Sequence, residues 1–161
     1  MHAAVLPAPV GGVKRRVTAI LLCLLLLVSA FAAWAWLRPY DWHADPAARF
    51  KIVQAQLKRD HSYYWLDLML ERGGEARHDD TKPVTLKTAS GRVLEPADTT
   101  LAGNEGEAPD QRLWLKFWLE PADLNGPLEL KLNDGTLSVK SGGGVPAVGA
   151  DGPKLFLSNH W

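Results

Sequence analysis

The sequence predicts an all-β body, an antiparallel β-sandwich of immunoglobulin-like or fibronectin-like shape, preceded by one N-terminal transmembrane helix. Three observations lead to this prediction. Residues 17–37 form an apolar run without a charge. Through residues 50–161, short segments alternate apolar and polar residues, as half-buried strands do. Clusters of Gly, Pro, Asn and Asp separate these segments, as in a sandwich of about seven short strands.

The apolar run 17–37 has the length of a membrane span. As a helix its 21 residues would rise about 31 Å, and the hydrocarbon core of a bilayer is about 30 Å thick. Basic residues precede the run and the first acids follow it. The positive-inside rule therefore predicts a single-pass protein of a bacterial inner membrane, with a cytoplasmic N-terminus and a periplasmic body. The residues expected at the membrane interfaces are Lys14, Arg15, Arg16, Trp34, Trp36, Tyr40 and Trp42.

A cleaved signal peptide is the alternative interpretation of this segment. Residues 17–28 would then be its apolar region, and Ala30-Phe31-Ala32 offers a small-residue cleavage site. The run continues past that site to an aromatic cluster, which favours an uncleaved signal anchor. Both interpretations place the body outside the cytoplasm. The predicted organisation is a short disordered cytoplasmic tail at 1–16, the membrane helix at 17–37, a linker at 38–49 and the extracytoplasmic domain at 50–161.

Strict alternation predicts the strands of the body. Residues 50–57 fit either a helix or a strand, but every second residue from Tyr64 to Leu70 is apolar, which favours a hairpin turning at 59–62. On its first strand, Val53, Ala55 and Leu57 would face inward. Further strands are expected around 84–94, at 113–120, at 128–139 as a hairpin turning at Asn133-Asp134-Gly135, and within 154–161.

Outward-facing aromatic residues are the most unusual feature of these strands. The strand at 113–120 places Trp114 and Trp118 on the face that should meet water, and the strand at 63–71 does the same with Tyr63, Trp65 and Met69. If the two strands are neighbours, these side chains form one patch, and exposed apolar patches mark binding surfaces. The competing interpretation is that a loop or the C-terminal arm covers them, or that a bulge reverses the register.

Trp161 is included in the predicted binding surface, with three roles left open. Its indole could pack into the end of the sandwich, face a partner, or cover the aromatic patch. The predicted aromatic binding residues are therefore Tyr63, Trp65, Trp114, Trp118 and Trp161.

Composition and motifs argue against several classes of function. Residues 1–37 hold three basic residues and no acid, so the rest of the chain carries 15 basic and 18 acidic residues, which argues against nucleic-acid binding. Cys23 is the only cysteine, and no phosphate loop, nucleophile elbow or zinc-protease motif occurs. We therefore expect neither an enzyme nor a cofactor. His78, Asp79 and Asp80 are weak candidates for metal ligands, because a metal site needs three or four convergent groups.

The function expected from the sequence is that of a membrane-anchored binding or assembly module. Its partners would be the lipid bilayer and a protein in the membrane or periplasm, so that the chain would be an accessory or scaffold subunit of an inner-membrane complex. The alternatives are an envelope glycan-binding module that stacks sugars on the same aromatics, and a metal-binding extracytoplasmic protein.

Overall fold

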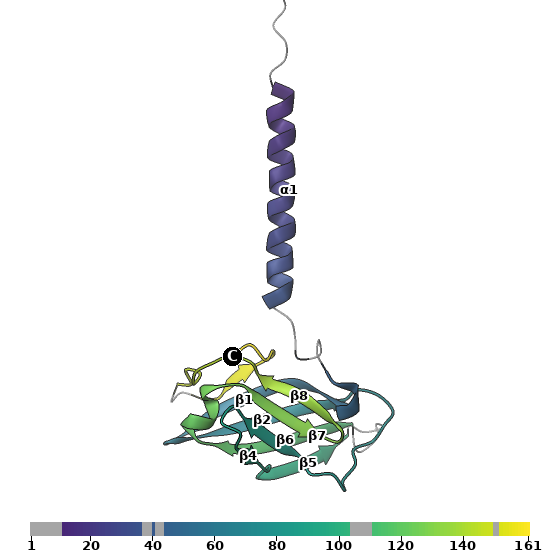
Figure 1. Ribbon diagram of the computed structural model, residues 1–161, viewed down its shortest axis with the longest axis vertical. Helices are drawn as coiled ribbons and strands as arrows, with labels where there is room; N and C mark the ends of the chain where they lie inside the picture. The colour runs from purple at the N-terminus through teal and green to yellow at the C-terminus, as the bar shows by residue number, and fades with distance from the viewer. Residues whose placement is uncertain (1–10, 37–39, 41–43, 104–110, 150–151) are drawn as a thin grey trace, which may run out of the picture. The chain divides into compact units, whose positions relative to one another are not determined.

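The chain consists of an N-terminal helix and a β-rich body. The computed structural model describes residues 11–36, 40, 44–103, 111–149 and 152–161. The chain divides into two compact units, Met1–Leu37 and Arg38–Trp161. The first unit contains one apolar helix, α1, and the second contains nine described strands in two antiparallel sheets (Figure 1).

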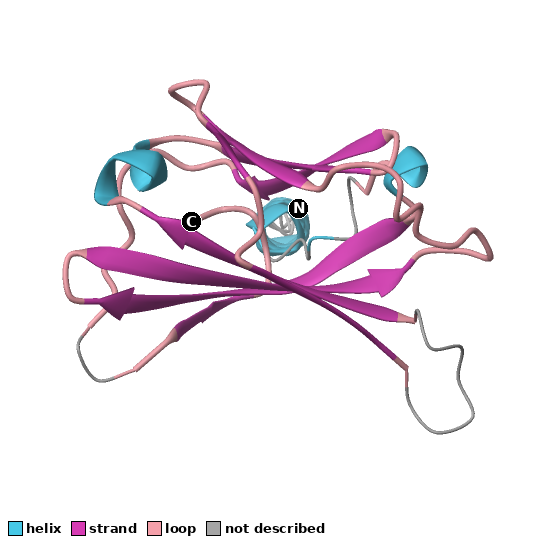
Figure 2. Cartoon of the chain, turned by 90° about the horizontal axis from the view of Figure 1, so that it is seen from below, coloured by secondary structure: helices cyan, strands magenta, loops and turns pink. Residues whose placement is uncertain are grey.

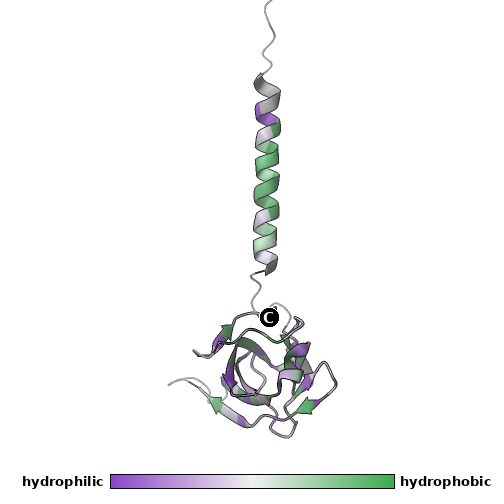
Figure 3. Ribbon diagram, turned by 90° about the vertical axis from the view of Figure 1, so that its left-hand side faces the viewer, coloured by the Kyte–Doolittle hydropathy of each residue, from purple (hydrophilic) through white to green (hydrophobic). Residues whose placement is uncertain are grey.

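Helix α1 spans Gly11–Trp36 and begins earlier than the sequence suggested. Residues 11–16, which were assigned to the tail, are helical, whereas the rest of that tail lies outside the described residues. Its segment Arg15–Trp34 is long and apolar enough to cross a membrane, and Figure 3 colours much of it as hydrophobic.

The larger sheet has five strands in the order β5-β6-β2-β1-β9. The strands are β1 (Phe50–Asp60), β2 (Tyr63–Arg72), β5 (Asp98–Ala102), β6 (Arg112–Leu119) and β9 (Lys154–Phe156). The predicted hairpin of β1 and β2 is confirmed, and it turns at His61, which has a positive φ of 54°. Strand β5 was not predicted, because its sequence lacks apolar alternation.

The smaller sheet has four strands in the order β4-β3-β7-β8. The strands are β3 (Thr85–Thr88), β4 (Val93–Leu94), β7 (Leu128–Leu132) and β8 (Gly135–Lys140). The predicted β7–β8 hairpin is confirmed, with Asn133 at a φ of 52° in its turn. Two 3-10 helices, η2 (Pro46–Ala48) and η3 (Pro121–Asn125), precede β1 and β7.

One hydrophobic core unites the inward residues of both sheets, which form two facing layers in Figure 2. The alternation on β2, β6 and β7 is regular, and their buried residues include Leu66, Leu68, Leu70, Leu113, Leu115, Phe117, Leu128 and Leu130. The inward placement of Val53 was wrong. The register of β1 against β2 shifts between Ile52 and Gln54, and before this bulge Ile52 faces inward in place of Val53, whereas Ala55 and Leu57 are buried as predicted.

Residues assigned to the linker contribute to the core of the body. Ala48 is fully buried, and the Tyr40 side chain is only 8% exposed. The carboxylate of Asp45 caps η2 by accepting the backbone N–H of Ala47, at 2.9 Å, and also accepts the N–H of Thr136 on β8. The segment that leads into β1 is thus fixed to the smaller sheet.

Candidate functional site

Strands β2 and β6 are neighbours, so the outward aromatics predicted from their sequences share one surface. In the antiparallel register, Trp65 lies opposite Trp118 and Met69 lies opposite Trp114. Residues directly opposite each other point to the same side of a sheet. The outer side of the larger sheet therefore carries Tyr63, Trp65, Met69, Trp114 and Trp118, a surface called the aromatic face below.

The aromatic face is open to solvent. Tyr63 and Trp114 are each 40% exposed and Trp118 is 38% exposed, whereas Trp65 and Met69 are half-buried. Neither a bulge within the β2–β6 pair nor the described C-terminal arm removes these side chains from the surface. The side chains that the sequence predicted on the wet side of these strands therefore do reach solvent.

Side-chain contacts support three members of the aromatic face, Tyr63, Trp65 and Trp118. The Tyr63 ring stacks on Trp118, with centroids 4.3 Å apart. The Trp65 indole N–H donates to Asp60 Oδ2 at 3.2 Å, and the Lys116 ammonium lies 5.4 Å from the Trp65 ring centroid. Hydrogen bonds from His61 and Trp65 lower the pKa of Asp60, so this acceptor stays ionised. Side chains ordered in advance lose little entropy when a partner binds.

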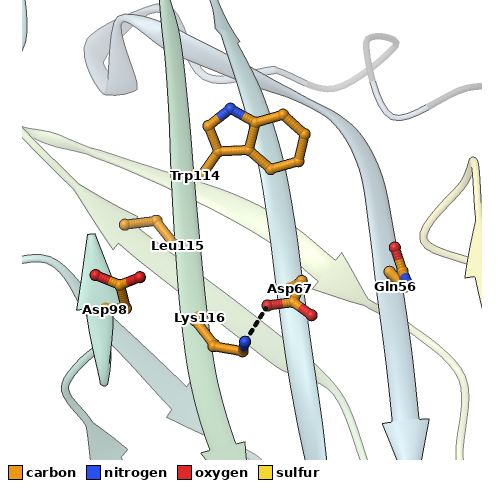
Figure 4. Close-up of a pocket in the computed structure, with 6 residues that line it drawn as sticks. All are labelled: Gln56, Asp67, Asp98, Trp114, Leu115 and Lys116. Atoms are coloured by element: carbon orange, nitrogen blue, oxygen red, sulfur yellow. Dashed lines mark ion pairs between the residues drawn. The ribbon is translucent and has the colours of Figure 1, made fainter. Parts of the chain in front are cut away.

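A shallow pocket of about 210 Å³ lies beside Trp114 (Figure 4). Its lining comes from four strands of the larger sheet and consists of Gln56, Asp67, Asp98, Trp114, Leu115 and Lys116. In Figure 4 Lys116 reaches across to Asp67, and the two charged groups are 3.7 Å apart. This pocket could not be predicted from the sequence, because polar residues at outward strand positions indicate no pocket until the strand order is known.

The outer side of the smaller sheet has the opposite chemistry. Its exposed positions on β7 and β8 are Glu129, Lys131, Thr136 and Ser138. This is the polar alternation expected of a sheet that faces water. Aromatic exposure in the described strands is therefore a property of one sheet face rather than of the whole body.

Trp161 does not belong to the aromatic face, which corrects its assignment from the sequence. Its ring stacks on Phe156 with centroids 4.3 Å apart, and its indole N–H donates to the Tyr40 hydroxyl at 2.7 Å. Phe156 lies opposite the buried Ala55, so this stack is on the inner side of the larger sheet. Of the three roles considered, the structure shows packing into the end of the core.

Tyr40 was predicted at the membrane interface, and the structure places it in the body instead. Its hydroxyl donates to the Val139 carbonyl at 2.8 Å while accepting the N–H of Trp161, and burial raises its pKa above the usual range. Tyr40, Phe156 and Trp161 are called the terminal clamp. The other predicted interface residues stay predictions: Arg15, Arg16 and Trp34 are exposed on α1, Lys14 and Trp36 lie on α1, and Trp42 lies outside the described residues.

Replacing Trp161 with alanine is expected to destabilise the body. The change removes the stack on Phe156 and leaves the buried Tyr40 hydroxyl without its donor, which together cost roughly 2 kcal/mol. Trp161→Phe keeps a ring and loses only the hydrogen bond, so it should cost about half as much. Urea unfolding of the detergent-solubilised full chain measures both, and equal stability of all three proteins would show that the clamp contributes nothing.

The weak metal candidates do not converge. His78 Nδ1 lies 3.0 Å from Asn133 Oδ1, and Asp79 accepts the backbone N–H and the hydroxyl of Thr81, which lowers the pKa of Asp79. Asp80 is exposed, 3.7 Å from His78 Nε2. Within the described part of the chain, no group of three or more His, Cys, Asp or Glu side chains could hold a metal ion. The group instead fixes a loop to the β7–β8 turn.

No protein-family model, curated protein or solved structure matches this chain. The aromatic face and the apolar helix are therefore the features from which a function can be inferred.

Proposed function

We propose that the protein is a membrane-anchored binding or assembly module, an accessory or scaffold subunit of a bacterial inner-membrane complex that docks through its aromatic face. The observation that carries this proposal is the row of exposed, mutually supported aromatics on one face of one sheet. Tyrosine and tryptophan are the residues that most often anchor protein interfaces, and the polar outer face of the smaller sheet provides no such anchors.

The proposed fold of the body is an immunoglobulin-like β-sandwich. Its strand order supports this, because β1-β2-β6-β5 follows the A-B-E-D sheet and β4-β3-β7-β8 follows the C′-C-F-G sheet of that architecture. Strand β9 is an addition beside β1. The body lacks the disulfide of antibody domains, since Cys23 lies in α1. Many binding domains share the sandwich without sharing sequence, so the fold is compatible with the proposed role but does not specify a partner.

The proposed topology is a signal anchor with the N-terminus in the cytoplasm and the body in the periplasm. Arg15 and Arg16 precede the apolar stretch of α1, and cytoplasmic flanks carry such positive residues. Only residues 37–39 separate the end of α1 from Tyr40, which is bound into the body. An anchor joined this closely confines the body to the membrane surface and raises its effective concentration toward membrane partners.

The test of this proposal is purification of the full-length chain from its native membranes in a mild detergent, with the co-purifying proteins identified by mass spectrometry. We expect one membrane protein in stoichiometric amount, bound by the wild-type chain. A full-length chain that is folded in the detergent but purifies without a partner would contradict the docking role.

Glycan binding is the second candidate, and the pocket beside Trp114 is the observation that favours it. The indole of Trp114 can stack on a sugar ring. The carboxylate, amide and ammonium groups beside it can form hydrogen bonds with the hydroxyls of that sugar. If so, the chain should be retained on insoluble peptidoglycan, and Trp114→Ala should abolish retention. Trp118→Ala is the matched control, since Trp118 does not line the pocket. Equal behaviour of both variants, or no retention of wild type, would remove this candidate.

A further inference from the structure

The edges of the two sheets are protected unequally. A strand at the edge of a sheet exposes unpaired N–H and C=O groups, which can pair with another strand. The larger sheet ends in β5 and β9, and the smaller sheet ends in β4 and β8. Proteins usually protect such edges by shortening them, covering them, or adding proline, lysine or a bulge.

Three of the four edges carry such protection. On β8, the backbone N–H of Thr136 donates to Asp45 at 3.0 Å, and just after β8 that of Ser141 donates to the Asn159 carbonyl at 2.7 Å. Strand β4 has only two residues and β9 has only three, so both edges are short. These edges offer little backbone to a second strand.

Strand β5 is the exception among the described strands. It pairs with β6 over Asp98–Ala102 without a register shift, and it contains neither proline nor lysine. Four of its five residues are exposed, including Leu101 at 39%. In the part of the chain that the structure describes, no hydrogen bond reaches the other side of this strand. The open edge is continuous with β6, which carries Trp114 and Trp118.

We propose that β5 pairs antiparallel with β5 of a second copy of this chain, which joins the two larger sheets and makes their aromatic faces continuous. The inference is independent of which partner the aromatic face binds. A two-fold contact of this kind is isologous, so it closes at a dimer and does not propagate.

The sequence of β5 allows antiparallel pairing with its own copy without a contact between like charges, which favours a second copy as the occupant. With the two-fold axis at Thr100, Thr100 faces its own copy, Asp98 faces Ala102, and Thr99 faces Leu101. Like charges are therefore not opposite each other. The two Asp98 carboxylates are offset by four residues, about 13 Å along the strands, which exceeds the physiological Debye length of about 8 Å.

The pairing extends the aromatic face across the dimer. Thr100 lies opposite Trp114 in the β5–β6 pair, so both point to the outer side of the sheet. The two Trp114 side chains would then be three strand spacings apart, about 14 Å. A five-residue edge gives a weak dimer in solution, and confinement of both anchors to one membrane raises the local concentration that it needs.

Cysteine cross-linking of the full-length chain in its native membrane tests this pairing. The body contains no cysteine, so a Cys23→Ser background removes the single thiol of the chain. In that background Thr100→Cys places two thiols at the two-fold axis, where opposite Cα atoms are about 4.5–5.5 Å apart, within disulfide range. We expect a disulfide dimer for Thr100→Cys and none for Leu155→Cys, an exposed position on the opposite edge. Equal cross-linking at the two positions would overturn the proposal.

A charge on β5 provides the second arm of the test. Leu101 lies opposite the buried Leu113, so Leu101→Lys puts an ammonium on the inner side of the edge. Added to Thr100→Cys, it should reduce the dimer at least tenfold, whereas Leu155→Lys should not change it. If Thr100→Cys alone forms no disulfide dimer, the proposal is overturned. If in that case the Thr100→Cys thiol also resists maleimide labelling in the membrane, a different protein covers β5.

Discussion

Replacing Trp114 and Trp118 together with alanine is expected to abolish partner binding while the body remains folded. Each indole is about two-fifths exposed and projects from the outer side of the larger sheet. Interface tryptophans of this kind commonly contribute 2 kcal/mol or more, so losing both weakens binding by about a thousandfold. Affinity for the co-purified partner and urea unfolding of the same full-length variant measure the two effects separately.

The matched control is the double variant Lys131→Ala and Thr136→Ala on the outer side of the smaller sheet. It removes two exposed side chains from strands of the same body and should leave binding unchanged. Unfolding of the tryptophan variant would mean that Trp114 and Trp118 act as core residues. Unchanged binding by a folded tryptophan variant would remove the aromatic face from the interface.

Replacing Gly135 with alanine is expected to cause the largest loss of stability, about 3 kcal/mol or more. A Cβ at this position would lie 2.2 Å from the backbone nitrogen of Ala48 and 2.8 Å from the carbonyl carbon of Ala47. Backbone atoms cannot move aside as a flexible side chain can, so η2 and the start of β8 would have to separate. Asn133 stabilises the same contact between η2 and the β7–β8 turn, since its side-chain amide donates to the Ala48 carbonyl at 2.6 Å.

Gly143→Ala is the control for this substitution. No atom lies within 4 Å of a Cβ there, and its φ is not in the left-handed region. Its free energy of unfolding should differ from that of wild type by less than about 0.5 kcal/mol. Urea unfolding of both variants checks the prediction, and similar midpoints would contradict the close packing of η2 on β8.

Local patterns in the sequence predicted much of the fold. Alternation gave the β1–β2 and β7–β8 hairpins because each joins strands that are adjacent in the chain. It failed at Val53, where a bulge adds a residue, and at β5, where threonines replace the apolar positions. Periodicity carries no information about such irregularities.

Only part of the candidate site could be predicted, because alternation gives the side of a strand on which a residue lies but not which strands are neighbours. Outward orientation of Trp114 and Trp118 follows from local alternation, but their placement beside Trp65 and Met69 depends on β2 pairing with a strand distant in sequence. The terminal clamp joins Tyr40 to Trp161, which are 121 residues apart, and no short pattern could indicate that contact.

The most direct measurement of the central claim is site-specific photo-crosslinking of the full-length chain in its native membrane. A benzophenone amino acid at Tyr63 probes the aromatic face and replaces one aromatic side chain with another, while the same group at Lys131 probes the outer side of the smaller sheet. We predict one adduct with a membrane or periplasmic protein from position 63 and none from position 131. Adducts from position 131 alone, or none from position 63, would contradict docking through the aromatic face.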